Sequence, residues 1–100
     1  MSLQDILNKE IKKYLCQIDR EQSLFDDNEL STILRILHPD CEVLIYACSS
    51  SDNDAADMAC DMQDYVNKGV VEEMAHYWLD VEEDYYTHQY PVLLIKTKEV

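Results

Sequence analysis

The sequence has little glycine, little proline and few basic residues. Its 100 residues include one Gly, two Pro and eight Lys and Arg, against 21 Asp and Glu, which gives a formal net charge of −13. A single glycine excludes a Gly-rich phosphate-binding loop, which needs several glycines at fixed spacing. The excess of acids excludes attraction to a nucleic-acid backbone or an anionic membrane surface. We therefore expect no direct nucleic-acid ligand and no membrane partner.

Long apolar runs are also missing. A run such as Val92 to Ile95 is the length of a short strand, whereas a membrane-spanning helix needs about 20 apolar residues. The N-terminal residues show no basic stretch followed by an apolar one, so we expect no signal peptide. The four cysteines form no CxxC pair, and we expect them to be reduced. These features predict a single cytoplasmic domain over residues 1–100.

Motifs for catalysis or metal binding are weak. No Ser-His-Asp or Cys-His set stands at a recognisable spacing. Residues 52–54 read Asp-Asn-Asp like the start of a calcium loop, but Asp57 stands where that loop needs glycine. His76 and Asp80 would supply only two ligands. We therefore predict that the protein is not an enzyme, with no catalytic residues, no metal and no cofactor.

Apolar periodicity is what the sequence does contain, since 47% of its residues are hydrophobic. Residues 3–18 repeat apolar side chains at helical spacing after Ser2, a candidate N-cap. A second helix is predicted from Asp26 or Asp27 to about His38, because the following proline disfavours helix there. Residues 42–48 and 91–97 are rich in strand formers. We expect these two strands to pair as a small antiparallel sheet.

The middle of the chain leaves two alternatives open. Residues 42–48 are predicted as a strand, followed by a polar loop. A helix is then predicted over 54–68, capped by Asp52 or Asp54, although one long helix over 42–66 also fits the spacing. Residues 70–84 are predicted as a fourth helix, but their tyrosines and tryptophan would also suit a strand. The expected fold class is α+β: two N-terminal helices, a small antiparallel sheet, and additional helices between its strands.

The charge is concentrated in the middle of the chain. Residues 21–90 carry a net charge of −15 and contain two cations, Arg35 and Lys68. A folded surface of closely spaced carboxylates can imitate a phosphate backbone, and its natural complement is a basic groove. Lasting binding also needs a desolvated apolar anchor. Tyr85, Tyr86 and Tyr90 stand beside further acids, a composition that suits an interface.

The order of these features resembles the phage-type uracil-DNA glycosylase inhibitors, which are small acidic DNA-mimic proteins. Residues 3–10 resemble the first helix of that family, and residues 21–24 (Glu-Gln-Ser-Leu) its Glu-Ser-hydrophobic segment. Residues 28–34 resemble its second helix, 38–52 its proline turn, first strand and polar loop, and 90–95 a later strand. The resemblance implies an inhibitor acting in a bacterial host cell.

The resemblance also implies a site. It places polar contacts near the Glu-Ser segment and an apolar pocket between the second helix and the sheet, where the enzyme's DNA-probing side chain would be held. With the neighbouring acids, the candidate partner-binding residues are Glu21, Gln22, Ser23, Asp26, Asp27, Glu29, Leu30, Ile33, Leu34, Ile45, Asp52, Asp54 and Leu94.

The expected partner is a basic nucleic-acid-binding enzyme, with uracil-DNA glycosylase favoured. Alternatives are a restriction or CRISPR nuclease, a nuclease toxin neutralised by an immunity protein, and an adaptor whose acidity serves only solvation. The charge pattern by itself does not separate the glycosylase, the restriction or CRISPR nuclease and the nuclease toxin, because each of them supplies a basic groove.

Overall fold

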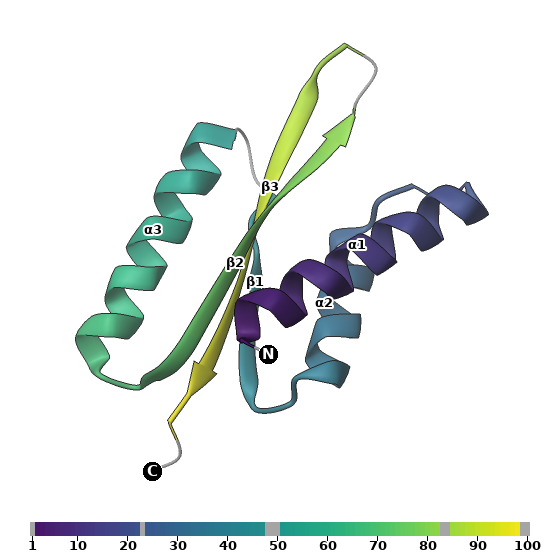
Figure 1. Ribbon diagram of the computed structural model, residues 1–100. Helices are drawn as coiled ribbons and strands as arrows, with labels where there is room; N and C mark the ends of the chain where they lie inside the picture. The colour runs from purple at the N-terminus through teal and green to yellow at the C-terminus, as the bar shows by residue number, and fades with distance from the viewer. Residues whose placement is uncertain (1, 23, 48–50, 83–84, 99–100) are drawn as a thin grey trace.

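The computed structural model describes residues 2–22, 24–47, 51–82 and 85–98. In this part of the chain three helices and three strands follow one another (Figure 1). They are α1 (Leu3–Glu21), α2 (Asp27–Leu37), β1 (Cys41–Ile45), α3 (Ser51–Lys68), β2 (Val71–Glu82) and β3 (Thr87–Thr97). The predicted α+β class is confirmed.

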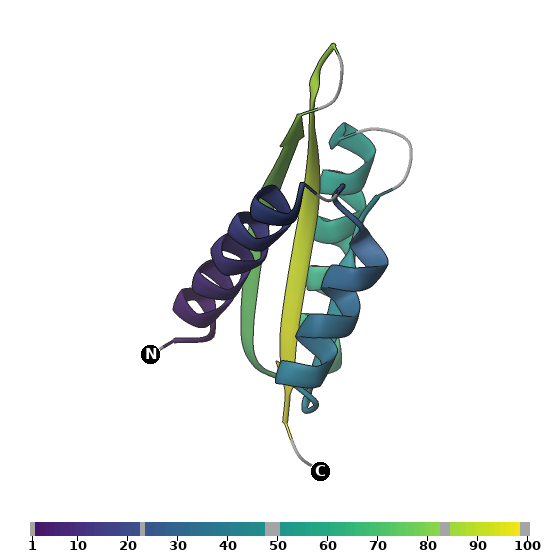
Figure 2. The same cartoon turned by 90° about the vertical axis from the view of Figure 1, so that its right-hand side faces the viewer.

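The strands form one antiparallel sheet in the order β1-β3-β2, so the C-terminal strand lies in the centre. The predicted pairing of the segments near 42–48 and 91–97 is confirmed for the described residues. Helices α1 and α2 cover one face of the sheet, and α3 covers the other (Figures 1 and 2). The far end of the β2–β3 hairpin projects beyond the helices (Figure 1).

The first two helices begin at side-chain caps. The hydroxyl of Ser2 accepts a hydrogen bond from the Asp5 N–H at 3.2 Å, and α1 ends where Gln22 takes a left-handed conformation with φ 55°. The Asp26 carboxylate accepts from the Asn28 N–H at 2.9 Å and caps α2. Both caps follow from the sequence.

Two separate clusters of apolar side chains hold the layers together. The run from Val92 to Ile95 is fully buried because β3 is covered on both faces. Val92 and Leu94 pack with the apolar faces of α1 and α2, whereas Leu93 and Ile95 pack with Met58 of α3. The apolar run that the sequence shows is therefore the centre of the core.

Pro91 explains why β1 is short although β3 is long. The N–H of Tyr46 donates to the carbonyl of Pro91 at 3.0 Å, so the backbone of Pro91 faces the β1 side of the sheet. Proline has no N–H to return the second hydrogen bond of such a pair, and the ladder with β1 stops here. Towards β2 no bond is lost, because the backbone of Pro91 faces away from its partner Trp78.

The two open alternatives have different outcomes. Residues 42–66 contain a strand and a separate helix, so strand-loop-helix is confirmed over one long helix. However, α3 begins at Ser51, so the predicted loop over 49–54 is wrong for residues 51–54, and so is the predicted cap at Asp52 or Asp54. Residues 49 and 50 lie outside the described residues. Gly69, with φ +68°, ends α3 as expected.

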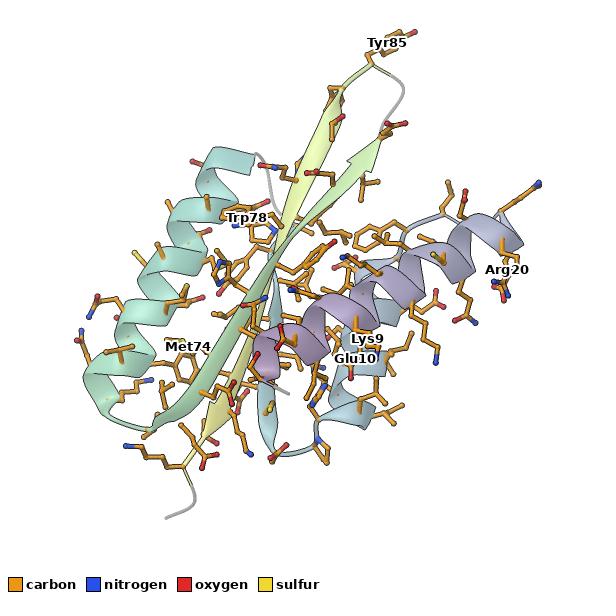
Figure 3. The ribbon with its side chains drawn as sticks, in the orientation of Figure 1. Lys9, Glu10, Arg20, Met74, Trp78 and Tyr85 are labelled. Carbon is orange, nitrogen blue, oxygen red and sulfur yellow. The ribbon has the colours of Figure 1, made fainter. Side chains whose placement is uncertain are left out.

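The predicted fourth helix over 70–84 is wrong, because residues 71–82 form β2. Tyr77 and Leu79 face α1 while Trp78 lies on the opposite side of the strand, as alternation requires (Figure 3). Pairing with β3 along the whole length of β2 outweighs the weak helical spacing. β-Branched and aromatic residues in this segment favour the same result.

Candidate functional site

The described elements share the negative charge unevenly. Helix α1 balances four acids with four basic residues, whereas α3 has five acids and one lysine, and β2 has four acids and no cation. Figure 3 shows Lys9 and Arg20 on α1, on the opposite side of the sheet from α3. The acids are therefore concentrated on α3 and β2, whereas α1 is neutral.

One row of carboxylates follows the length of α3. Asp57, Asp61 and Asp64 recur at i, i+4 and i+7, so they lie on one side of the helix. Glu42 of β1 lies close to them, since burial, followed by the charges of Glu42 and Asp61, raises the pKa of the Tyr65 hydroxyl of α3. We call these four acids the acidic strip. Asp57, Asp64 and Glu42 are exposed, and Asp61 is partly buried.

A tyrosine fixes the central carboxylate of the acidic strip. The Tyr46 hydroxyl donates a hydrogen bond to Asp61 Oδ2 at 2.6 Å. Burial of the ring, followed by this hydrogen bond and the charge of Asp61, raises the pKa of Tyr46 well above its usual value. The tyrosine therefore remains a neutral donor, and the Asp61 carboxylate has a defined position.

An apolar groove of about 470 Å³ lies between α1 and α2. Its lining residues are Glu10, Lys13, Tyr14, Gln17, Leu30, Ile33, Leu34, Ile36 and Leu37. Leu30 and Leu34 are fully buried, whereas Ile36 is 73% exposed and Leu37 also faces solvent. His38, which follows α2, connects the two helices, because its Nε2 atom lies 2.9 Å from Oε2 of Glu10 on α1. The groove thus combines a packed floor with an exposed apolar rim.

The groove differs in place from the pocket that the resemblance implied. Leu30, Ile33 and Leu34 line it, but Ile45 and Leu94 do not. Leu94 is fully buried in the same cluster as Leu30 and Leu34, and Ile45 packs against that cluster. Side chains therefore fill the space between α2 and the sheet, and the described groove opens between the two helices instead.

The predicted polar contacts are dispersed. Glu21 and Gln22 end α1, while Asp26, Asp27 and Glu29 surround the start of α2. Acids at a helix N-terminus are favourable in any protein, so this position gives the second group a structural role. Ser23 and the side chain of Asp52 lie outside the described residues.

Asp54 is corrected as a contact residue because its carboxylate is fully buried. It lies 3.7 Å from the Nε2 atom of His88.

Tyr85 and Tyr86 are exposed, Tyr85 at 96%, but Tyr90 is partly buried and packs on Phe25 at a ring distance of 5.1 Å. Figure 3 shows Tyr85 at the far end of the hairpin.

Sequence reasoning missed the acidic strip as a unit. The spacing of Asp57, Asp61 and Asp64 could have revealed the part on α3, because it repeats along one side of a predicted helix. Glu42 could not have been added, since nothing in the sequence places β1 beside that side of α3.

Cys41 supplies a prediction of pH dependence. Burial, followed by the charge of Asp40, raises the pKa of the Cys41 thiol from 9.0 to about 11. The unfolded chain therefore loses this proton first as pH rises, and the thiol's contribution to stability, complete below pH 9, falls away towards pH 11.

We expect the free energy of unfolding to decrease between pH 9 and pH 10, and to decrease less in Cys41→Ala. The raised pKa values of Tyr14, Tyr46 and Tyr65 act mainly above their usual value of 10.0. Urea denaturation at pH 8, 9 and 10 measures the difference. Cys60→Ala, at an exposed position on α3, is the matched control and should keep the wild-type profile. Equal slopes for Cys41→Ala and the wild type would contradict the assignment.

Two searches within the described residues found nothing. No group of three or more His, Cys, Asp or Glu side chains in residues 2–22, 24–47, 51–82 and 85–98 is placed to hold a metal ion. Across the same residues, no helix has the length and apolar character needed to cross a membrane.

Comparisons with known proteins do not extend this description. No protein-family model, no curated protein and no solved structure matches the chain. The acidic strip and the groove are therefore the features that bear on function.

Proposed function

We propose that the protein is an acidic inhibitor that occupies the DNA-binding groove of a basic DNA-processing enzyme, with uracil-DNA glycosylase as the first candidate. The observation that carries this proposal is the acidic strip. It consists of Glu42, Asp57, Asp61 and Asp64, and Lys68 at the end of the same helix lies over the ring of Tyr65.

The spacing of the strip supports imitation of a phosphate backbone. With a rise of about 1.5 Å per residue, the residues Asp57, Asp61 and Asp64 follow one another at intervals of ~4.5–6 Å along α3. One DNA strand carries a phosphate for about every 3.4 Å of its axis. The strip thus approaches the charge density of a strand, in a geometry fixed by the helix and by the hydrogen bond from Tyr46 to Asp61.

The strip is costly in the free protein. Like charges at i and i+4 each destabilise a helix by roughly 0.2–0.5 kcal/mol, and the strip contains such a pair in Asp57 and Asp61. A basic groove would remove this repulsion on binding and would accelerate association. An acidity needed only for solubility would gain nothing from placing the carboxylates so close together.

The groove between α1 and α2 supplies the second requirement of an inhibitor. Charge gives fast association, but slow dissociation needs apolar surface that is desolvated in the complex. Ile33, Ile36 and Leu37 offer such surface beside the buried floor of the groove. The groove lies on the opposite face of the sheet from the acidic strip. We propose that an apolar side chain of the enzyme reaches it around the β1 edge, in the role that the resemblance gives to a pocket beside the sheet.

The test measures uracil excision from a labelled oligonucleotide at increasing inhibitor concentration. We expect inhibition to be complete near one inhibitor per enzyme. We also expect the dissociation constant, measured directly by calorimetry, to rise at least tenfold between 50 and 300 mM KCl, because salt screens the two charged surfaces. No inhibition at a tenfold excess would exclude this enzyme.

Restriction and CRISPR nucleases form the second arm of the same test, because they present basic grooves of the same kind. Inhibition of a nuclease but not of the glycosylase would keep the inhibitor and change its target. Binding that does not respond to salt would contradict a charge-based mechanism for any of these enzymes.

A further inference from the structure

Beyond His76, the outer edge of β2 carries backbone groups that make no hydrogen bond to any other residue that the structure describes. Strand β2 is at the edge of the sheet, and its pairing with β3 leaves alternate residues with N–H and C=O pointing outwards. The position of Pro91 opposite Trp78 identifies which residues these are, because the Pro91 backbone faces β1. Trp78, Asp80 and Glu82 therefore present their backbone groups to solvent.

A side chain of α1 already pairs with this edge at His76. The Gln4 amide accepts from the His76 N–H at 3.0 Å and donates to the His76 carbonyl at 2.6 Å. One glutamine thus makes the two hydrogen bonds that a neighbouring strand would make at this position. The edge is accordingly covered at His76, and α1 then diverges from the hairpin (Figure 1).

The two sides of the free edge differ in chemistry. On the side of α1, a groove of about 300 Å³ is lined by five apolar residues and three acids: Leu15, Ile18, Leu24, Phe25 and Val81, with Asp19, Asp80 and Glu82. Leu24 is 90% exposed, although it is a large apolar residue. On the side of α3 the strand alternation places Trp78, which is 40% exposed, with the carboxylates of Asp80 and Glu82.

We propose that the edge of β2 from Trp78 to Glu82 binds an extended basic segment of the partner by antiparallel strand addition. The proposal rests on the proposed function, because it takes the partner to be a basic protein. Residues opposite each other in such a pair share a face. The segment therefore needs basic residues opposite Trp78, Asp80 and Glu82, and apolar residues between them that enter the groove.

Charge distinguishes this occupant from a second copy of the chain. Two β2 edges paired with each other would bring Asp80 and Glu82 of one copy close to the same acids of the other, which disfavours self-association. A cation opposite Asp80 has the opposite effect, and one opposite Trp78 also gains a cation–π contact. Strand addition supplies backbone hydrogen bonds, and the alternating side chains supply the specificity.

The first probe is the peptide Ac-Arg-Val-Arg-Val-Arg-amide, with Ac-Arg-Arg-Arg-Val-Val-amide as its control of equal composition and charge. We expect the alternating peptide to bind the full chain at least tenfold more tightly at 50 mM KCl. We also expect the amide protons of Trp78, Asp80 and Glu82 to become protected from exchange when it binds. Equal affinity of the two peptides would overturn the proposal.

Backbone methylation of the peptide tests the geometry without changing the protein. In the proposed register the central arginine faces Asp80 and makes two backbone hydrogen bonds, whereas the valines point their N–H away from β2. Methylating the N–H of the central arginine should therefore lower the affinity at least tenfold, and methylating that of a valine should change it less than threefold. The same loss from both methylations would overturn strand addition.

A variant of the protein tests the same strand pairing without changing the peptide. Asp80→Pro removes an N–H that faces outwards, so the sheet should keep its hydrogen bonds. We expect at least a tenfold loss of peptide binding, against a loss of less than fivefold for Asp80→Asn, which removes only the charge. Equal losses in the two variants would contradict the proposed pairing.

Failure of this inference can be told apart from failure of the proposed function. Enzyme inhibition without any preference for the alternating peptide would leave the inhibitor and overturn the edge site. A preference for that peptide, lost on methylation of the central arginine, would support the edge site even if no DNA-processing enzyme is inhibited.

Discussion

Replacing Leu94 with alanine should lower the free energy of unfolding by about 3 kcal/mol. Leu94 is fully buried at the centre of the sheet, between Val43 of β1 and Ala75 of β2, and it belongs to the cluster that holds α1 and α2. Alanine would leave a cavity that the small side chain of Ala75 cannot fill. Urea denaturation followed by circular dichroism measures the change.

Leu24→Ala is the matched control for this experiment. It removes the same atoms from a side chain that is 90% exposed, so the free energy of unfolding should change by less than about 0.5 kcal/mol. Similar losses for the two variants would mean that Leu94 is not in the core, and that the placement of β3 in the centre is wrong.

Reversing two charges of the acidic strip should weaken binding to the inhibited enzyme roughly 100-fold, about 2.7 kcal/mol. Asp57→Lys with Asp64→Lys removes two attractive contacts, each of up to about 1 kcal/mol, and replaces them with repulsion of similar size. Both side chains are exposed, so folding should be preserved. Calorimetry with the glycosylase or nuclease that shows inhibition measures the effect.

Asp5→Lys on α1 is the control for the single variant Asp57→Lys, because each reverses one charge. Asp5 is exposed and belongs to a helix with four basic residues, on the opposite side of the sheet from the acidic strip. We expect Asp57→Lys to weaken binding about tenfold and this control to weaken it less than about threefold at the same salt concentration. If both single variants weaken binding equally, net charge and not the acidic strip determines affinity.

Much of the fold follows from local patterns. The apolar spacing of residues 3–18 and the caps at Ser2 and Asp26 predict α1 and α2, since a helix needs one apolar side and a partner for its first N–H groups. Residues 92–95 are predicted as a strand because they are a short run of strand formers after Pro91.

The wrong predictions lie where two patterns compete. Residues 70–84 place apolar side chains at spacings that suit a helix, but Ala75, Tyr77, Leu79 and Val81 also alternate as a strand requires. The presence of β3 decides between them, because its backbone pairs with β2 over the length of the hairpin. A segment read by itself contains no information about that partner.

The candidate site divides in the same way. The acids of α3 are visible in the sequence as a repeat, yet their meeting with Glu42 depends on β1 lying beside the helix. Leu30, Ile33 and Leu34 are visible as an apolar helix face. Whether that face closes on the sheet or leaves a groove depends on how α1 packs across it.

By itself, the sequence determined an acidic protein with a neutral first helix, two capped N-terminal helices and a buried C-terminal strand, because charge, capping and apolar periodicity are local properties. Only the tertiary structure decided that β2 is a strand, that its outer edge is covered at His76 and free from Trp78 onwards, and that the groove lies between α1 and α2. The physical reason is that strand pairing and helix packing join residues far apart in the chain, and no local pattern specifies which of them meet.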